Sequence, residues 1–251
     1  MTDFSYQLYC SRKFGPLSKT LEMVAGYGYT QVEGYGALYK DAAAVEELKS
    51  LLGANNLTMP SGHFGLDQLE DDPDGVLAIA RDLGITDVFC PHLAPDQRPA
   101  DAAGYVAFGE RLQAAGKPYR DAGLSFGWHN HAFEFEALPD GSMPLERMFE
   151  GGPDLKWEAD VAWVARGGAD ALAWIRKEAA RITAVHIKDI AREGEKADED
   201  GWADIGEGTL DWPALMAEIR NTRAHLFVME HDNPSDDDRF ARVSIAAAQA
   251  L

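Results

Sequence analysis

The chain has 251 residues and carries 42 Asp and Glu against 23 Lys and Arg, which gives a formal net charge of −19 at pH 7. This acidic excess argues against a nucleic-acid-binding protein with a broad basic face, and against a protein that docks on anionic lipid. Hydrophobic residues make up 46% of the chain, which is enough to fill a sizeable core and excludes a disordered protein.

The cysteine content and the first residues of the chain indicate the compartment. Cys10 and Cys90 are the two cysteines, and they form no CxxC motif, so a disulfide framework is excluded. The opening MTDFSYQLYC lacks a basic segment followed by an apolar run, and no stretch approaches the roughly 18 apolar residues of a membrane span. We therefore expect a soluble, cytoplasmic protein.

A short apolar run, a polar turn and a longer amphipathic segment repeat along the chain. Eight runs are expected to form strands, at residues 4–10, 30–34, 57–63, 87–90, 124–129, 154–160, 182–188 and 225–230. Helices are expected between them, including 16–26, 42–52, 75–83, 102–122, 169–180 and 212–221. Strands that alternate with helices imply parallel pairing. Eight such units predict an α/β fold, a single (β/α)8 TIM-barrel domain spanning residues 1–251.

One segment, residues 192–204 (REGEKADEDGWAD), looks too polar to pack in a core. It follows the seventh predicted strand, and the loops after barrel strands line the catalytic face. Two interpretations stay open, a solvated loop and a lid over an active site.

Polar side chains collect where the predicted strands end. They are His63, His129, His131, Glu134, Asp160, His186, Lys188 and Glu230. In a barrel these ends converge on one mouth, where carboxylates and imidazoles are costly unless they pair or bind a cation. One divalent metal ion explains the cluster, because its charge keeps neighbouring carboxylates ionised. Such ligands suit Mn²⁺, Mg²⁺, Co²⁺ or Zn²⁺ and do not select among them.

Motifs at these positions carry a family resemblance. They are GYGYTQVEGYG at 26–36, SGHFGL at 61–66, HNHAFEFE at 129–136, WEADVAWVARGG at 157–168, VHIKD at 185–189, DIGEGTLDW at 204–212 and MEHDNP at 229–234. In their order and spacing the chain resembles the xylose-isomerase-like sugar phosphate isomerase/epimerase family, whose relatives include ketose 3-epimerases, hydroxypyruvate isomerases, inosose dehydratases and endonuclease IV. The resemblance covers essentially the whole chain. It implies a TIM barrel that holds one divalent metal through Glu, Asp, His and Glu from strands five to eight, and three of these match Asp160, His186 and Glu230.

The fifth strand departs from the family pattern. Ketose epimerases place a Glu at this strand end a few residues before an Asn, whereas residues 126–130 here read FGWHN. Either Glu134 folds back as the fourth ligand, which we favour, or His129 or His131 takes its place. The departure puts simple 3-epimerase chemistry in doubt, because that mechanism uses two metal-bound glutamates.

The resemblance implies proton abstraction next to a carbonyl through a metal-stabilised enediolate. Glu230 is the expected base, and Glu134 or His131 is the expected second proton-transfer group. Lys188 is expected either to hold an oxyanion or to form a solvent-facing ion pair with Asp189. Further residues are expected to contact substrate, namely His63, His129, Glu33 and Arg12, with sugar-stacking surfaces offered by Trp128, Trp163, Trp202 and Trp212.

Three functions follow from these observations. The first is a metal-dependent isomerase or epimerase of a sugar or keto-sugar. The second is a lyase, either a dehydratase of inosose type or an enzyme of β-elimination on a 3-keto-glycoside, which His129 and His131 favour because a leaving oxygen needs a general acid. The third, a sugar-binding protein on a degenerate barrel, is opposed by the retained Asp160, His186 and Glu230. The negative charge favours a neutral sugar or cyclitol, and the sequence is compatible with a homo-oligomer.

Overall fold

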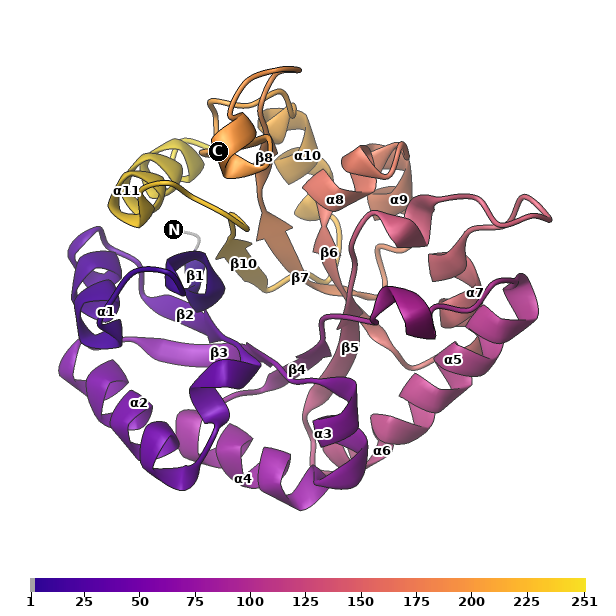
Figure 1. Ribbon diagram of the computed structural model, residues 1–251, viewed down its shortest axis with the longest axis horizontal. Coiled ribbons are helices and arrows are strands. Elements are labelled where there is room, and N and C mark those ends of the chain that lie inside the picture. The colour runs from indigo at the N-terminus through magenta and orange to yellow at the C-terminus, as the bar shows by residue number, and fades with distance from the viewer. Residues whose placement is uncertain (1–2) are drawn as a thin grey trace.

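Eight parallel strands close into a barrel in the computed structural model, which describes residues 3–251 (Figure 1). The barrel strands are β1 Ser5–Gln7, β2 Gln31–Gly34, β3 Thr58–His63, β4 Asp87–Cys90, β5 Ser125–His129, β6 Lys156–Asp160, β7 Ile182–Ile187 and β10 Leu226–Met229. Each strand pairs with its neighbours in chain order, and β1 pairs with β10 to close the barrel. The predicted (β/α)8 barrel in a single domain is therefore confirmed.

Helices form the outer ring of the molecule (Figure 1). They are α1 Leu17–Gly26, α2 Ala42–Ala54, α3 Leu66–Asp71, α4 Pro73–Leu83, α5 Ala102–Ala115, α6 Lys117–Asp121, α7 Pro144–Gly151, α8 Val161–Arg166, α9 Ala171–Lys177, α10 Trp212–Ile219 and α11 Asp237–Ala248. Many begin after an Asp whose carboxylate accepts a backbone N–H of the first turn. Asp41, Asp101 and Asp236 cap α2, α5 and α11 in this way.

The structure differs from the predicted elements where local side chains intervene. The first predicted strand, 4–10, ends at Gln7, because the Gln7 side chain accepts the Tyr9 N–H at 3.1 Å and starts a short 3-10 helix, Leu8–Ser11. The predicted helix 102–122 is two helices, α5 and α6, and Pro118 lacks the N–H that a continuous helix needs. Helices α3, α7, α8 and α11 were not among the expected segments.

The polar segment 192–204 is not a solvated loop throughout. Its strand β9, Trp202–Ala203, pairs antiparallel with β8, Asp189–Ile190, which lies just before the segment, and Trp202 and Asp204 are buried. Arg239 of α11 donates to Asp204 at 2.8 Å and to Glu199 at 2.6 Å. These ion pairs neutralise the carboxylates, which explains how such a polar sequence packs against the barrel.

Asp189 anchors both ends of the same loop through hydrogen bonds to backbone N–H groups. Its carboxylate accepts four backbone N–H groups, from Ile190, Gly206, Thr209 and Leu210, at 2.9–3.2 Å. A side chain at Gly208 would place its Cβ 2.1 Å from the Asp189 carboxylate, so glycine is required there. The expected solvent-facing ion pair between Lys188 and Asp189 is therefore wrong, because Asp189 is committed to the loop backbone.

Within residues 3–251, none of the helices has both the length and the apolar character that crossing a membrane requires.

Candidate functional site

A cavity of about 420 Å³ lies at the carboxyl ends of the barrel strands, where the loops converge. Its lining includes His63 from β3, His129 at the end of β5 and His131 just beyond, with Glu230 and Asp232 after β10. Imidazoles and carboxylates from both halves of the chain therefore share one cavity.

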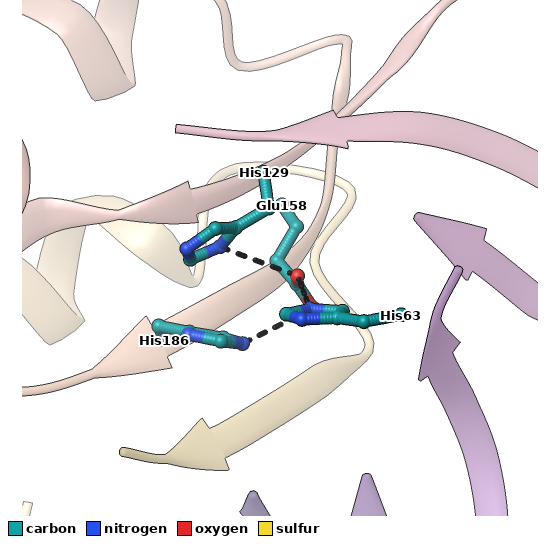
Figure 2. Close-up of side chains that lie close together, drawn as sticks. All are labelled: His63, His129, Glu158 and His186. Atoms are coloured by element: carbon teal, nitrogen blue, oxygen red, sulfur yellow. Dashed lines mark hydrogen bonds and ion pairs between the residues drawn. The ribbon is translucent and has the colours of Figure 1, made fainter. Parts of the chain in front are cut away.

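Three imidazoles surround the buried carboxylate of Glu158 (Figure 2). His63 Nε2 lies 2.5 Å from Glu158 Oε2, and His129 Nδ1 lies 3.3 Å from the same oxygen. His186 Nε2 lies 3.3 Å from Glu158 Oε1. Donor atoms of all four residues fall within 4.8 Å of one another.

A second group shares two of these imidazoles and lies at four neighbouring strand ends. It comprises His129, Asp160, His186 and Glu230, from the ends of β5, β6, β7 and β10, again with donor atoms within 4.8 Å. His186 Nδ1 lies 2.8 Å from Glu230 Oε2 and 3.9 Å from Asp160 Oδ2. The structure thus brings together Asp160, His186 and Glu230.

Asp160 is held so that one carboxylate oxygen stays free. Its Oδ1 accepts the Trp163 N–H at 2.9 Å and caps α8, and its own N–H donates to Asn130 Oδ1 at 2.9 Å. Asn130 in turn accepts from Trp157 Nε1 at 2.8 Å. Among the described residues the remaining oxygen, Oδ2, has no hydrogen-bond partner, and the Lys188 ammonium lies 3.5 Å from it.

Glu134 lies elsewhere, which differs from the expectation that it completes the ligand set. Its buried carboxylate accepts from Trp128 Nε1 at 2.8 Å and from the His131 N–H at 2.9 Å. Burial raises the pKa of Glu134 to about 8. Among the alternatives at the fifth strand, His129 joins the groups of possible ligands in the described chain, and neither Glu134 nor His131 does.

Lys188 is fully buried beside the second group. Its ammonium lies 3.3 Å from Glu230 and 3.5 Å from Asp160, and it contacts Asp232. The indole of Trp202 covers the ammonium, with the ring centroid 4.1 Å away. Burial lowers the pKa of Lys188, but Asp232 and Glu230 outweigh that effect and raise it. The cation is therefore permanent and offsets part of the negative charge.

The remaining predicted contacts differ in their access to the cavity. Glu33 is fully buried and bonded to other side chains, whereas His63 borders the cavity. Arg12 stacks its guanidinium 3.7 Å from the centroid of Tyr9, a residue of the lining. Trp128, Trp202 and Trp212 are buried in the core, so the expectation that they stack on a sugar is wrong.

The protonation states differ among the members of the second group. Burial lowers the pKa of His186, but Glu158, Glu230 and Glu33 outweigh that effect and raise it, so a metal ion would have to displace a proton from this imidazole. Burial and the neighbouring His186 lower the pKa of His129 to about 4, so this imidazole is neutral at pH 7, as a ligand must be. Burial raises the pKa of Asp160 to about 7, with Lys188 opposing the rise. Within residues 3–251, neither His129 Nδ1 nor Asp160 Oδ2 makes a hydrogen bond, although Glu158 lies 3.3 Å from the first atom and the Lys188 ammonium 3.5 Å from the second. Buried nitrogen and oxygen atoms that lack a hydrogen bond are suitable metal ligands, so the cluster could bind a metal ion.

Two acidic residues of the site were not singled out from the sequence. Glu158 precedes Asp160 by two positions, and alternate residues of a strand face the same side, so this spacing was the available signal. Asp232 follows Glu230 by two positions, but it lies beyond β10, where strand alternation gives no guide. Both carboxylates add to the charge that a cation would balance.

The chain belongs to the xylose isomerase-like TIM barrel family, whose profile matches residues 21–250. Curated protein sequences give no significant match. Among solved structures, a sugar phosphate isomerase/epimerase from Parabacteroides distasonis superposes with a TM-score of 0.85 at 19% identity, covering 100% of this chain and 94% of that one.

Two further solved structures share the barrel. The probable 3-DHS dehydratase AsbF from Bacillus anthracis has a TM-score of 0.75 at 12% identity, over 99% of each chain. An IOLI protein with a bound zinc atom has a TM-score of 0.71 at 13% identity, over 99% of this chain and 97% of that one. At these identities the similarity establishes the fold.

Proposed function

We propose that the protein is a divalent-metal-dependent isomerase or epimerase of a sugar or keto-sugar, acting by proton abstraction next to a carbonyl. The observation that carries this proposal is the convergence of His129, Asp160, His186 and Glu230 from four neighbouring strands on one buried point. His129 takes the place in this set that the sequence had favoured for Glu134. A structurally similar protein that holds a zinc atom supports a metal-binding role for this cluster.

A bound divalent cation would supply positive charge that stabilises the negative charge developing on the substrate oxygens. Glu230 is the proposed base, since it borders the cavity and burial is offset by Lys188 and His186, which hold its pKa well below the ordinary value. The ionised carboxylate can then accept a proton from a substrate C–H within reach. Lys188, which is shielded from the cavity by its burial, keeps Glu230 ionised.

A second group must return the proton in an isomerisation or epimerisation. His131 is proposed for this role in preference to Glu134, because His131 borders the cavity and its Nδ1 has no hydrogen-bond partner in the described chain. Burial lowers the pKa of His131 well below its usual range, so the ring is neutral at rest. It would first accept the proton of a substrate hydroxyl at Nδ1, and because the protonated ring is acidic, it would then return that proton to the substrate. His63 is proposed to contact a substrate hydroxyl, because it borders the cavity.

The alternative is a lyase that begins with the same proton removal and then expels a β-substituent. His63 favours it, because its ring borders the cavity while Nε2 pairs with buried Glu158 at 2.5 Å. An imidazole oriented by a carboxylate can donate a proton to a leaving oxygen. A dehydratase with a similar fold supports this alternative.

The test is an NMR screen in D2O with sugars, keto-sugars, inososes and 3-keto-glycosides, using Co²⁺-loaded protein. Exchange of one substrate C–H for deuterium with the carbon skeleton retained indicates an isomerase or epimerase, and a new enone or a lost aglycone indicates a lyase. Glu230→Gln should slow exchange by about 100-fold or more, whereas exposed Glu207→Gln should not. Full exchange after removal of metal by EDTA would refute the metal-dependent mechanism.

A further inference from the structure

Glu33 belongs to a polar layer inside the barrel that the proposed mechanism does not use. The register places it opposite Gln7 of β1 and Ser61 of β3. Gln7 Nε2 donates to Glu33 Oε1 at 2.7 Å, and Ser61 Oγ donates to Glu33 Oε2 at 2.5 Å. All three side chains are fully buried. Two neutral donors therefore fix the Glu33 carboxylate without cancelling its charge.

The fixed carboxylate faces His186 of β7. His186 Nε2 lies 2.8 Å from Glu33 Oε1 and 3.3 Å from Glu158 Oε1. Glu158 is engaged by His63 at the shorter distance of 2.5 Å. Glu33 is therefore the hydrogen-bond partner of His186 Nε2, while Nδ1 on the other side of the ring faces Glu230 and Asp160.

The partner of one ring nitrogen decides which nitrogen can bind a metal. A ligating histidine uses one nitrogen while the other carries a proton, and a carboxylate that accepts this proton fixes both the tautomer and the ring orientation. An ionised carboxylate only accepts hydrogen bonds, so Nε2 must carry the hydrogen when it bonds to Glu33. Without a cation, Nδ1 also shares a hydrogen with Glu230, at 2.8 Å. A cation that binds Nδ1 would displace that hydrogen, whereas Nε2 would keep its own hydrogen bond to Glu33.

We infer that Glu33 is a positioning residue that holds His186 with its proton on Nε2, so that Nδ1 is the atom that binds the divalent cation. The inference rests on the proposed function, because it concerns the ligand set named there. It also gives Gln7 and Ser61 a role, because their hydrogen bonds hold the Glu33 carboxylate in place beside the His186 ring.

Metal affinity tests the inference separately from catalysis. In calorimetric titrations with Co²⁺, Glu33→Gln should bind about 10- to 100-fold more weakly than the wild type, the usual cost of removing such a partner. Ser61→Ala should show a smaller loss, since one of the two donors remains. The control is Glu47→Gln, which makes the same change on the exposed face of α2 and should bind like the wild type. Equal affinity of Glu33→Gln and Glu47→Gln would overturn the inference.

The tautomer can be read in the wild-type protein, so the test survives if Glu33→Gln does not fold. In ¹⁵N-labelled protein loaded with Zn²⁺, two-bond ¹H–¹⁵N correlations should show a protonated Nε2 and a metal-bound Nδ1 for His186, assigned with His186→Gln. A metal-bound Nε2 would overturn the positioning role. Wild-type protein that binds neither Co²⁺ nor Zn²⁺ would overturn the proposed metal centre as well, whereas normal wild-type binding with an unaffected Glu33→Gln refutes only the inference.

Discussion

The ammonium of Lys188 lies 3.3 Å from the carboxylate of Glu230, in a barrel interior where the lysine side chain is 0% exposed and the glutamate side chain 6%. Asp160 and Asp232 also lie next to the lysine, so the single charged ammonium of Lys188 forms ion pairs with three carboxylates. A buried ion pair contributes little net stability, but removing one partner leaves uncompensated charge.

Lys188→Met should therefore lower the free energy of unfolding of the metal-free protein by about 3–5 kcal/mol at pH 7. The methionine keeps much of the length of the side chain and removes its charge. Urea unfolding followed by circular dichroism measures the change. Exposed Lys49→Met is the control and should change stability by less than about 0.5 kcal/mol. A similarly small effect of Lys188→Met would show that its charge is not needed to balance these carboxylates.

Asp160→Asn and Glu134→Gln should separate the two candidates for the ligand set. Asp160 has a free, buried Oδ2 beside His186, whereas both oxygens of Glu134 accept hydrogen bonds elsewhere. We expect Asp160→Asn to weaken Co²⁺ binding by about 100-fold or more, beyond the usual cost of losing an outer-shell partner. Glu134→Gln should bind Co²⁺ like the wild type. Titration calorimetry measures both, and a large loss in Glu134→Gln would restore that residue as a ligand.

His225 should make the stability of the barrel depend on pH. Immediately before β10, His225 Nε2 lies 3.2 Å from buried Asp87 Oδ2, and this hydrogen bond raises the pKa of the half-exposed imidazole. The stabilisation is fully present below the unfolded pKa, near 6.5, and is lost as pH rises through the higher folded pKa. His225→Gln should therefore cost up to about 1 kcal/mol at pH 5.5 and less at pH 8.5.

The control for this prediction is His92, whose pKa is shifted in the opposite direction. Burial lowers the pKa of His92, so its protonation below about pH 6.5 destabilises the folded state. His92→Gln should lose no additional stability at pH 5.5 compared with pH 8.5. Denaturant unfolding at the two pH values measures both variants, and a pH-independent effect of His225→Gln would contradict the assignment.

Arg239→Leu should loosen the polar segment 192–204. The guanidinium bonds to buried Glu199 and Asp204. Without it Asp204 loses the side-chain hydrogen bonds that it makes in the described chain, whereas Glu199 keeps only its contacts with Lys196 and Ser235. We expect a loss of about 3 kcal/mol in the free energy of unfolding and faster amide exchange across the segment. Hydrogen-exchange mass spectrometry measures the exchange, with exposed Arg81→Leu as the control. Unchanged protection of the segment would mean that the hairpin β8–β9 holds it without the ion pairs.

The sequence was sufficient to predict the barrel and three of the residues at its mouth. Apolar runs that end in polar residues recur at the strand ends, and this pattern places Asp160, His186 and Glu230 without any knowledge of tertiary contacts. The ligand contributed by the fifth strand was harder to predict, because the path of the chain after Asn130 decides whether Glu134 reaches the mouth of the barrel. The hydrogen bonds of Glu134 to Trp128 and His131 turn it away.

The burial of Glu199, Trp202 and Asp204 within the segment 192–204 depends on contacts that a local pattern does not contain. Its composition is that of a solvated loop, and the residue that neutralises it, Arg239, lies 35 positions beyond Asp204. The buried Glu158 was overlooked for a related reason. Its role depends on His63, which lies 95 positions away in the chain.

The four backbone N–H groups gathered by Asp189 also have a consequence for how this chain can vary. Because the base of the loop is fastened immediately after Lys188, its outer tip at residues 193–196 can lengthen or shorten while Trp202 stays over the lysine. Insertions and deletions should therefore be tolerated at that tip, leaving the charged centre undisturbed.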